Sequence, residues 1–162
     1  MASKTDFTPA EWEQQLKAPM WASIAVVASS PSGPLGVVKE FFAAGKHLAE
    51  ARSGTQNPLV SAVVADLSTS EGRERAQPKE VKGKKPDEVR AMAITALQQV
   101  ASLVDAKAGA DADGFKRWLA GLAGRVAEAS KEGGFLGVGG TRVDEQEKTA
   151  LADIGKALGV SV

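Results

Sequence analysis

The sequence predicts an all-α fold: a single-domain bundle of about seven helices with angled packing. Three observations favour this fold class. Apolar residues recur at the spacing of helices, capping residues precede these stretches, and runs of β-branched residues that would form strands are few. With 162 residues, 43% of them hydrophobic, the chain is long enough to bury a core without a disulfide or a structural metal.

The first two helices are predicted on either side of Pro19. Thr8 and Glu11 have the spacing of a capping box, which marks the start of the first helix. This helix is predicted to end near Lys17, because proline has no N–H to donate to the helical hydrogen-bond ladder. Proline suits the first turn of a helix, so a second helix is predicted over residues 19–28. Its residues are apolar on all sides, which indicates a buried position at the centre of the bundle.

Five further helices complete the predicted bundle, which forms one domain over residues 1–162. A proline or an acidic residue in the first turn marks most of their starts, and Gly54 and Gly159 mark two ends. Each of these helices carries apolar residues on one face. They are predicted over residues 35–53, 58–67, 86–104, 111–126 and 144–158.

Two segments interrupt the helical pattern. Residues 68–85 alternate in charge and lack an apolar period, which predicts an exposed charged linker or a frayed helix. The lysines of this linker are nearly balanced by neighbouring acids, and no aromatic residue lies among them to stack on a base. We therefore expect no nucleic-acid partner. The second segment, residues 132–143, is a glycine-rich loop.

The composition excludes several kinds of chemistry. The chain has no cysteine and a single histidine, so it lacks disulfides, thiolate zinc sites and two-histidine metal motifs. Its formal net charge is zero, which removes the overall attraction that drives non-specific binding to nucleic acids. No two carboxylates stand at a spacing that indicates acid–base catalysis. The sequence therefore predicts a protein that is not an enzyme and binds no cofactor.

The glycine-rich loop is the candidate contact surface. Glycines allow another group to approach the backbone closely, and apolar residues stand between them. A phosphate-binding loop would need a preceding strand and a terminal Gly-Lys-Ser/Thr, and both are missing. The loop is either a connector that closes the bundle or a surface for a protein partner or self-association. The candidate contact residues are Gly134, Phe135, Leu136, Gly137, Gly139, Gly140 and Arg142.

Acidic residues at the start of the last helix offer a different function. Glu145, Glu147 and Asp153 carry carboxylate oxygens, which are the ligands that hard divalent cations prefer. A divalent-metal site at these residues is therefore one alternative. Capping of the helix, with its dipole complemented by the first two acids, is the other interpretation.

An uncharged stretch over residues 18–38 raises the alternative of a membrane association. Its length would suffice for a membrane span, but the turn-forming residues in its middle would leave polar backbone groups in lipid. The alternative is thus a peripheral protein at a membrane surface. Because no apolar signal-peptide core follows the first residues, a cytoplasmic location is predicted.

The last helix and its entry follow a distinct order: a glycine, a β-branched residue three positions later, a glutamate four positions after that, and an apolar helix that ends in Leu-Gly. The residues concerned are Gly140, Val143, Glu147, Leu151, Ile154, Leu158 and Gly159. Through these residues the segment from Gly140 to Gly159 resembles the helix-entry segment of the tellurite-resistance TerB-like family. The family usually has aspartate directly before the glycine, where this chain has Gly139. The resemblance implies an all-helical bundle of about seven helices in bacteria, linked to stress or tellurite response and without established catalysis. It implies a non-enzymatic interaction or scaffold module.

Overall fold

The computed structural model describes residues 1–28, 56–132 and 142–161, and all regular structure within these ranges is helical. The all-α prediction is confirmed for these ranges, whereas the predicted helix at 35–53 lies outside them. The described elements are the 3₁₀ helices η1 (Lys4–Asp6) and η2 (Lys79–Val81) and the α-helices α1 (Pro9–Val27), α4 (Pro58–Leu67), α5 (Ser70–Arg75), α6 (Pro86–Lys107), α7 (Asp111–Glu132) and α8 (Arg142–Leu158).

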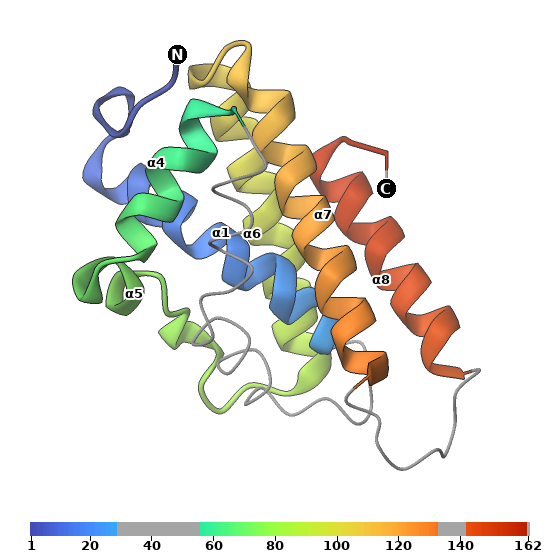
Figure 1. The fold of residues 1–162 in the computed structure, drawn as a ribbon. Helices are drawn as coiled ribbons and strands as arrows, with labels where there is room; N and C mark the ends of the chain where they lie inside the picture. The colour runs from blue at the N-terminus through green and yellow to red at the C-terminus, as the bar shows by residue number, and fades with distance from the viewer. Residues whose placement is uncertain (29–55, 133–141, 162) are drawn as a thin grey trace.

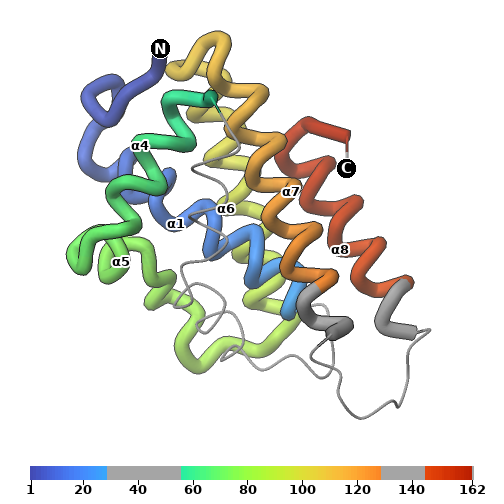
Figure 2. Tube along the Cα trace, in the orientation of Figure 1, coloured from blue at the N-terminus to red at the C-terminus, as the bar shows by residue number. Residues whose placement is uncertain are grey.

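The described helices pack around α1. Figure 1 shows α6, α7 and α8 running alongside one another, with α1 inclined against α6 and α7 and with α4 and α5 on the other side of α1. The chain reverses direction between α6 and α7 at Gly109, whose φ of 53° lies in the left-handed region that favours glycine. The N-terminus lies beside this turn (Figure 2), where the backbone N–H of Ala2 donates to Asp111 at 2.6 Å.

The start of α1 agrees with the prediction, but its end does not. Thr8 caps the helix and forms the predicted capping box with Glu11. The helix does not stop before Pro19; it continues to Val27, so the two helices predicted on either side of this proline are one. A proline inside a helix costs about 3 kcal/mol. Twelve of the 19 residues in α1 are buried, and burial of large apolar side chains, at about 1.5–3 kcal/mol each, outweighs that cost.

The predicted charged linker at 68–85 is mostly exposed, but it contains α5 and η2. α5 lacks an apolar face that would predict a helix, but its first turn is capped. The Thr69 hydroxyl accepts a hydrogen bond from the N–H of Gly72 at 2.9 Å. A side chain at Gly72 would collide with the backbone of Asp66, so glycine allows α5 to fold closely against the end of α4. After α5, the buried Ala76 packs into the hydrophobic core and attaches residues 68–85 to it.

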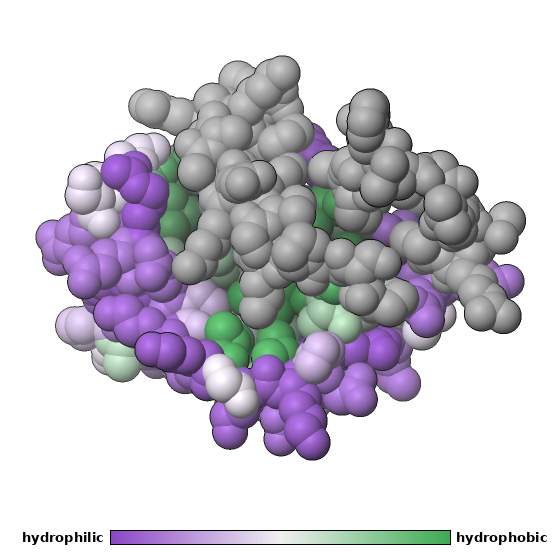
Figure 3. All heavy atoms as spheres, turned by 90° about the horizontal axis from the view of Figure 1, so that it is seen from below, coloured by the Kyte–Doolittle hydropathy of each residue, from purple (hydrophilic) through white to green (hydrophobic). Residues whose placement is uncertain are grey.

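The core is formed mainly by apolar side chains of α1, α4, α6 and α7, with a smaller share from α8. In the view from below, hydrophobic residues show in the middle of the described surface and hydrophilic residues surround them (Figure 3). Within the described ranges, no helix combines the length and the apolar character that crossing a bilayer requires.

Replacement of two glycines of α7 by alanine is expected to change the free energy of unfolding in opposite directions. Gly121 lies inside the helix, and an added methyl group would meet no other atom within 4 Å. We expect Gly121→Ala to raise the free energy of unfolding by about 0.5–1 kcal/mol, because glycine is the more disordered residue in the unfolded chain. The matched variant Gly114→Ala should lower it, since its Cβ would lie 2.5 Å from Nδ2 of Asn57. Urea denaturation of both variants checks the prediction, and a loss of stability in Gly121→Ala would contradict it.

Candidate functional site

The predicted contact loop lies almost entirely outside the described residues. Arg142 is the exception: it is the first residue of α8, which begins two residues before its predicted start at 144. At the other side of the loop, α7 continues to Glu132. The predicted contact residues that lie outside the described ranges are Gly134, Phe135, Leu136, Gly137, Gly139 and Gly140.

The three predicted metal ligands lie along α8 in different surroundings. Glu145 is exposed, whereas Glu147 is buried with 2% of its surface accessible. Asp153 is half-buried and forms an ion pair with Arg90 of α6. Among the side chains that the structure describes, no three acidic or histidine residues come together in a way that could hold a metal ion.

A groove between α1 and α6 is a candidate binding site among the described residues. Its volume is about 450 Å³, and η2 closes one side of it. Trp21 and Val100 are buried in its floor, beside the partly buried Met92 and Ala96. The residues that line the groove are Gln14, Lys17, Trp21, Glu80, Ala91, Met92, Thr95, Ala96, Gln99 and Val100.

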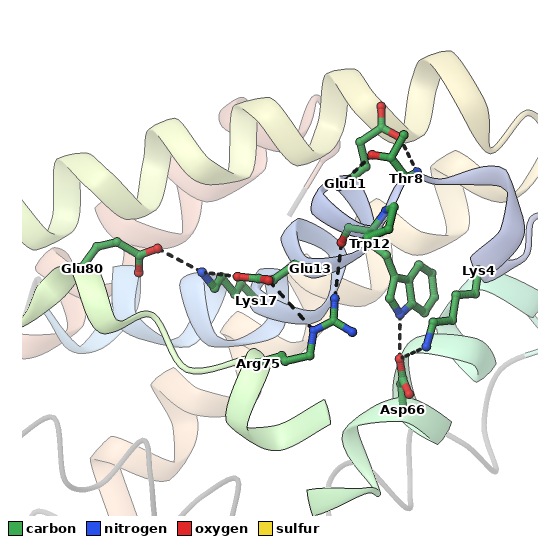
Figure 4. A network of polar contacts seen from close by, with 10 residues as sticks. Lys4, Thr8, Glu11, Trp12, Glu13, Lys17, Asp66, Arg75 and Glu80 are labelled. Atoms are coloured by element: carbon green, nitrogen blue, oxygen red, sulfur yellow. Dashed lines mark hydrogen bonds and ion pairs between the residues drawn. The ribbon is translucent and has the colours of Figure 1, made fainter. Parts of the chain in front are cut away.

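A lysine held by two carboxylates forms the η2 side of the groove. The Nζ atom of Lys17 lies 2.9 Å from Glu13 and 3.0 Å from Glu80, and only 16% of the lysine side chain is exposed (Figure 4). Burial lowers the pKa of Lys17, but the hydrogen bonds from this lysine to Glu13 and Glu80 outweigh burial and raise the pKa above its ordinary 10.5. The lysine therefore carries its charge at neutral pH and is already engaged by the protein itself.

The ion pairs continue from this lysine along the outside of α1 (Figure 4). The guanidinium of Arg75, at the end of α5, lies 4.0 Å from Glu13 and donates to the carbonyl of Pro9 at 3.4 Å. Together with the contact between Lys17 and Glu80, these interactions attach the α5–η2 segment to α1. The charged residues on the polar side of the groove therefore stabilise the packing of the α5–η2 segment on α1.

Further along α1, Trp12 and Asp66 connect α1 to α4. The indole N–H of Trp12 donates to Oδ2 of Asp66 at 2.7 Å, and the ammonium group of Lys4 donates to the same oxygen at 3.0 Å (Figure 4). Burial raises the pKa of Asp66, but these two hydrogen bonds have the larger combined effect in the opposite direction. The pKa of Asp66 therefore lies below its ordinary 3.8. The charged carboxylate is therefore the form that holds α1 and α4 together.

The lowered pKa of Asp66 predicts a loss of stability in acid. A carboxyl whose pKa is lower in the folded state binds fewer protons there, so its stabilising effect is present above pH 3.8 and is lost as the pH falls through the lowered native value. We expect wild type to be more stable than Asp66→Asn at pH 7 and the difference to shrink below pH 3.8. Urea denaturation across this range checks it, and a difference that stays constant with pH would contradict the prediction.

The opposite rim of the groove, on α6, carries no charge. Residues 91–104 contain no acidic or basic side chain, although 25% of the whole chain is charged. This stretch nevertheless has an exposed face; the exposed residues are Ala91, Thr95, Gln98, Gln99 and Ser102. Charged residues are depleted at the centres of protein interfaces, and this rim shares that one property with a contact surface.

Sequence reasoning did not identify this groove. The uncharged stretch at residues 91–104 can be recognised from the sequence alone, because charged residues are frequent in the rest of the chain. The pairing of α1 with α6, which places Trp21 beside Met92, depends on tertiary packing and leaves no local pattern.

Comparison of the chain with protein-family models, with curated proteins and with solved structures finds no match.

Proposed function

We propose that this chain is a non-enzymatic interaction module that binds a protein segment in the groove between α1 and α6. The observation that carries the proposal is the combination of an apolar floor with an uncharged, exposed rim on α6. Release of water from the partly exposed Met92 and Ala96 favours binding, because burial of apolar surface lowers the free energy. An uncharged rim adds hydrogen-bonding groups without the cost of burying a charge.

The titratable groups of the groove support a binding role over a catalytic one. The ammonium group of Lys17 donates hydrogen bonds to Glu80 and to Glu13. A general base or nucleophile needs a lone pair directed at the substrate, whereas these groups are directed at one another. The remaining polar groups of the groove are amides and a hydroxyl, which suit hydrogen bonding to a peptide.

The TerB-like resemblance of the segment from Gly140 to Gly159 implies the same class of function. The resemblance implies an all-helical protein linked to the tellurite or stress response and without established catalysis. The link to that response and the cytoplasmic location stay predictions for this chain. The groove proposal is independent of the resemblance, because no residue from 140 to 159 lines the groove.

Affinity purification with matched variants tests the proposal. Thr95→Arg places a charge on the α6 rim, and Thr149→Arg makes the same change at an exposed position of α8. Proteins that co-purify with wild type and Thr149→Arg should be lost or strongly reduced with Thr95→Arg. Recovery of the same proteins in equal amounts with both variants, or recovery of none with wild type, would overturn the proposed function.

A further inference from the structure

Four exposed lysines lie between the start of η2 and the start of α6, and none of them forms an ion pair within the described ranges. In the sequence, three acids stand among or directly after them and nearly balance their charge. The structure removes one of these acids from the balance, because Glu80 accepts a hydrogen bond from Lys17 of α1 at 3.0 Å. Asp87 and Glu88 are then the acids left beside the lysines. We call the four residues the lysine cluster: Lys79, Lys82, Lys84 and Lys85.

The lysine cluster lies at one end of the groove. Glu80 of η2 and Ala91 of α6 both line the groove, and residues 82–85 form the connection between these two walls (Figure 1). At a rise of about 1.5 Å per residue, the start of α6 at Pro86 lies about 8 Å along the helix axis from Ala91. Exposed charges act over about 8 Å at physiological ionic strength. A segment that fills the groove beside Ala91 therefore lies within reach of the positive charge of the cluster.

We propose that the groove binds an acidic peptide segment, whose uncharged residues lie in the groove and whose aspartate and glutamate side chains continue past Ala91 onto the lysine cluster. This inference rests on the proposed function, since it names the chemistry of the partner at the same site. Opposite charges at the rim of an interface speed the encounter and suppress wrong partners. The formal net charge of the whole chain is zero, so the local excess of lysines attracts the partner to this end of the groove.

Three features favour an acidic peptide over other anions. The cluster contains lysine and no arginine, and lysine lacks the planar fork that holds a phosphate through two hydrogen bonds. No aromatic residue lies within residues 68–90 to stack on the bases of a nucleic acid. A membrane surface would meet the exposed lysines, but it is too flat to reach Trp21 and Val100 in the floor of the groove. A peptide can contact the lysines and the floor together.

Selection from a random peptide library displayed on phage is the first test, with the full wild-type chain as the target. The selected peptides should combine apolar residues with several aspartates or glutamates, and lysine and arginine should be depleted in them. The matched target is the double variant Lys82→Gln/Lys84→Gln, which removes two charges and keeps two long polar side chains. The enrichment of acidic residues should fall on this target. Equal enrichment on the two targets would overturn the inference.

Fluorescence anisotropy of a labelled peptide from the wild-type selection measures the contribution of the cluster. Lys82→Gln/Lys84→Gln should weaken binding about fivefold at about 50 mM salt, as expected for the loss of two exposed charge pairs. The difference should shrink at about 500 mM salt, because exposed charges are then screened. The control Lys148→Gln/Lys156→Gln removes two exposed charges from α8 and should leave the affinity unchanged. Circular dichroism spectra equal to that of wild type would show that both double variants are folded.

Met92→Gln separates this inference from the proposed function, since it removes apolar surface from the groove without adding a charge. Peptides that are weakened by Met92→Gln but not by Lys82→Gln/Lys84→Gln leave the proposed function standing and overturn the acidic partner. Peptides that are weakened by the lysine substitutions alone bind outside the groove, which overturns both proposals.

Vesicles that contain phosphatidylserine test the membrane as the alternative source of negative charge. Wild type should bind these vesicles no more tightly than Lys82→Gln/Lys84→Gln does. Vesicle binding that depends on these two lysines, together with a peptide selection that yields no acidic peptide, would overturn the inference in favour of a membrane surface.

Discussion

Replacing Trp12 with alanine is expected to lower the free energy of unfolding by about 3–5 kcal/mol. Trp12 is one of the largest fully buried side chains, with 1% of its surface exposed. Its ring lies 5.9 Å from that of Phe7, and Nζ of Lys4 lies 5.9 Å from the indole centroid. The substitution therefore removes an aromatic contact and the hydrogen bond to Asp66, and leaves a cavity between α1 and α4.

Trp12→Phe serves as the matched control for this prediction. Phenylalanine keeps most of the apolar volume but cannot donate a hydrogen bond to Asp66, so it should cost less than alanine, on the order of 1.5–3 kcal/mol. Chemical denaturation followed by circular dichroism measures both losses. A loss of less than about 1 kcal/mol for Trp12→Ala would contradict the packing of α1 against α4. Equal losses for the two variants would assign the effect to the hydrogen bond alone.

Local signals predicted the starts of α1, α4, α6 and α7, but they missed α5 and placed the start of α8 two residues too late. The caps at Thr8 and Asn57 and the first-turn prolines at Pro58 and Pro86 lie where α1, α4 and α6 begin. A cap works because the first N–H groups of a helix need acceptors, and the residues that provide them are neighbours in sequence. Such signals are readable without knowing the fold.

The predictions that failed depend on contacts between distant residues. Pro19 marks a helix break by its local chemistry, but burial of nearly every residue from Ala18 to Val27 keeps the helix continuous. The hydrogen bond between Trp12 and Asp66 joins residues 54 positions apart, and no sequence pattern announces it. The groove has the same origin, since it exists only once α1 and α6 pack together.

Gln15 provides the second large effect, in the direction of greater stability. This residue of α1 is fully buried, and neither the oxygen nor the nitrogen of its amide has a hydrogen-bond partner among the described residues. Four positions later, Pro19 has no N–H to donate to the Gln15 carbonyl. Polar groups buried without partners cost about 1–3 kcal/mol each in proteins, so this turn of α1 carries a penalty that an apolar side chain would avoid.

We therefore expect Gln15→Met to raise the free energy of unfolding by about 1–3 kcal/mol, because methionine has a similar length and flexibility and leaves no polar atom unpaired. The adjacent Gln14 is exposed at the groove, so Gln14→Met should change stability by no more than about 0.5 kcal/mol. Urea denaturation of the two variants isolates the effect of burial from that of the substitution itself. A loss of stability in Gln15→Met that exceeds the change in Gln14→Met would contradict the prediction.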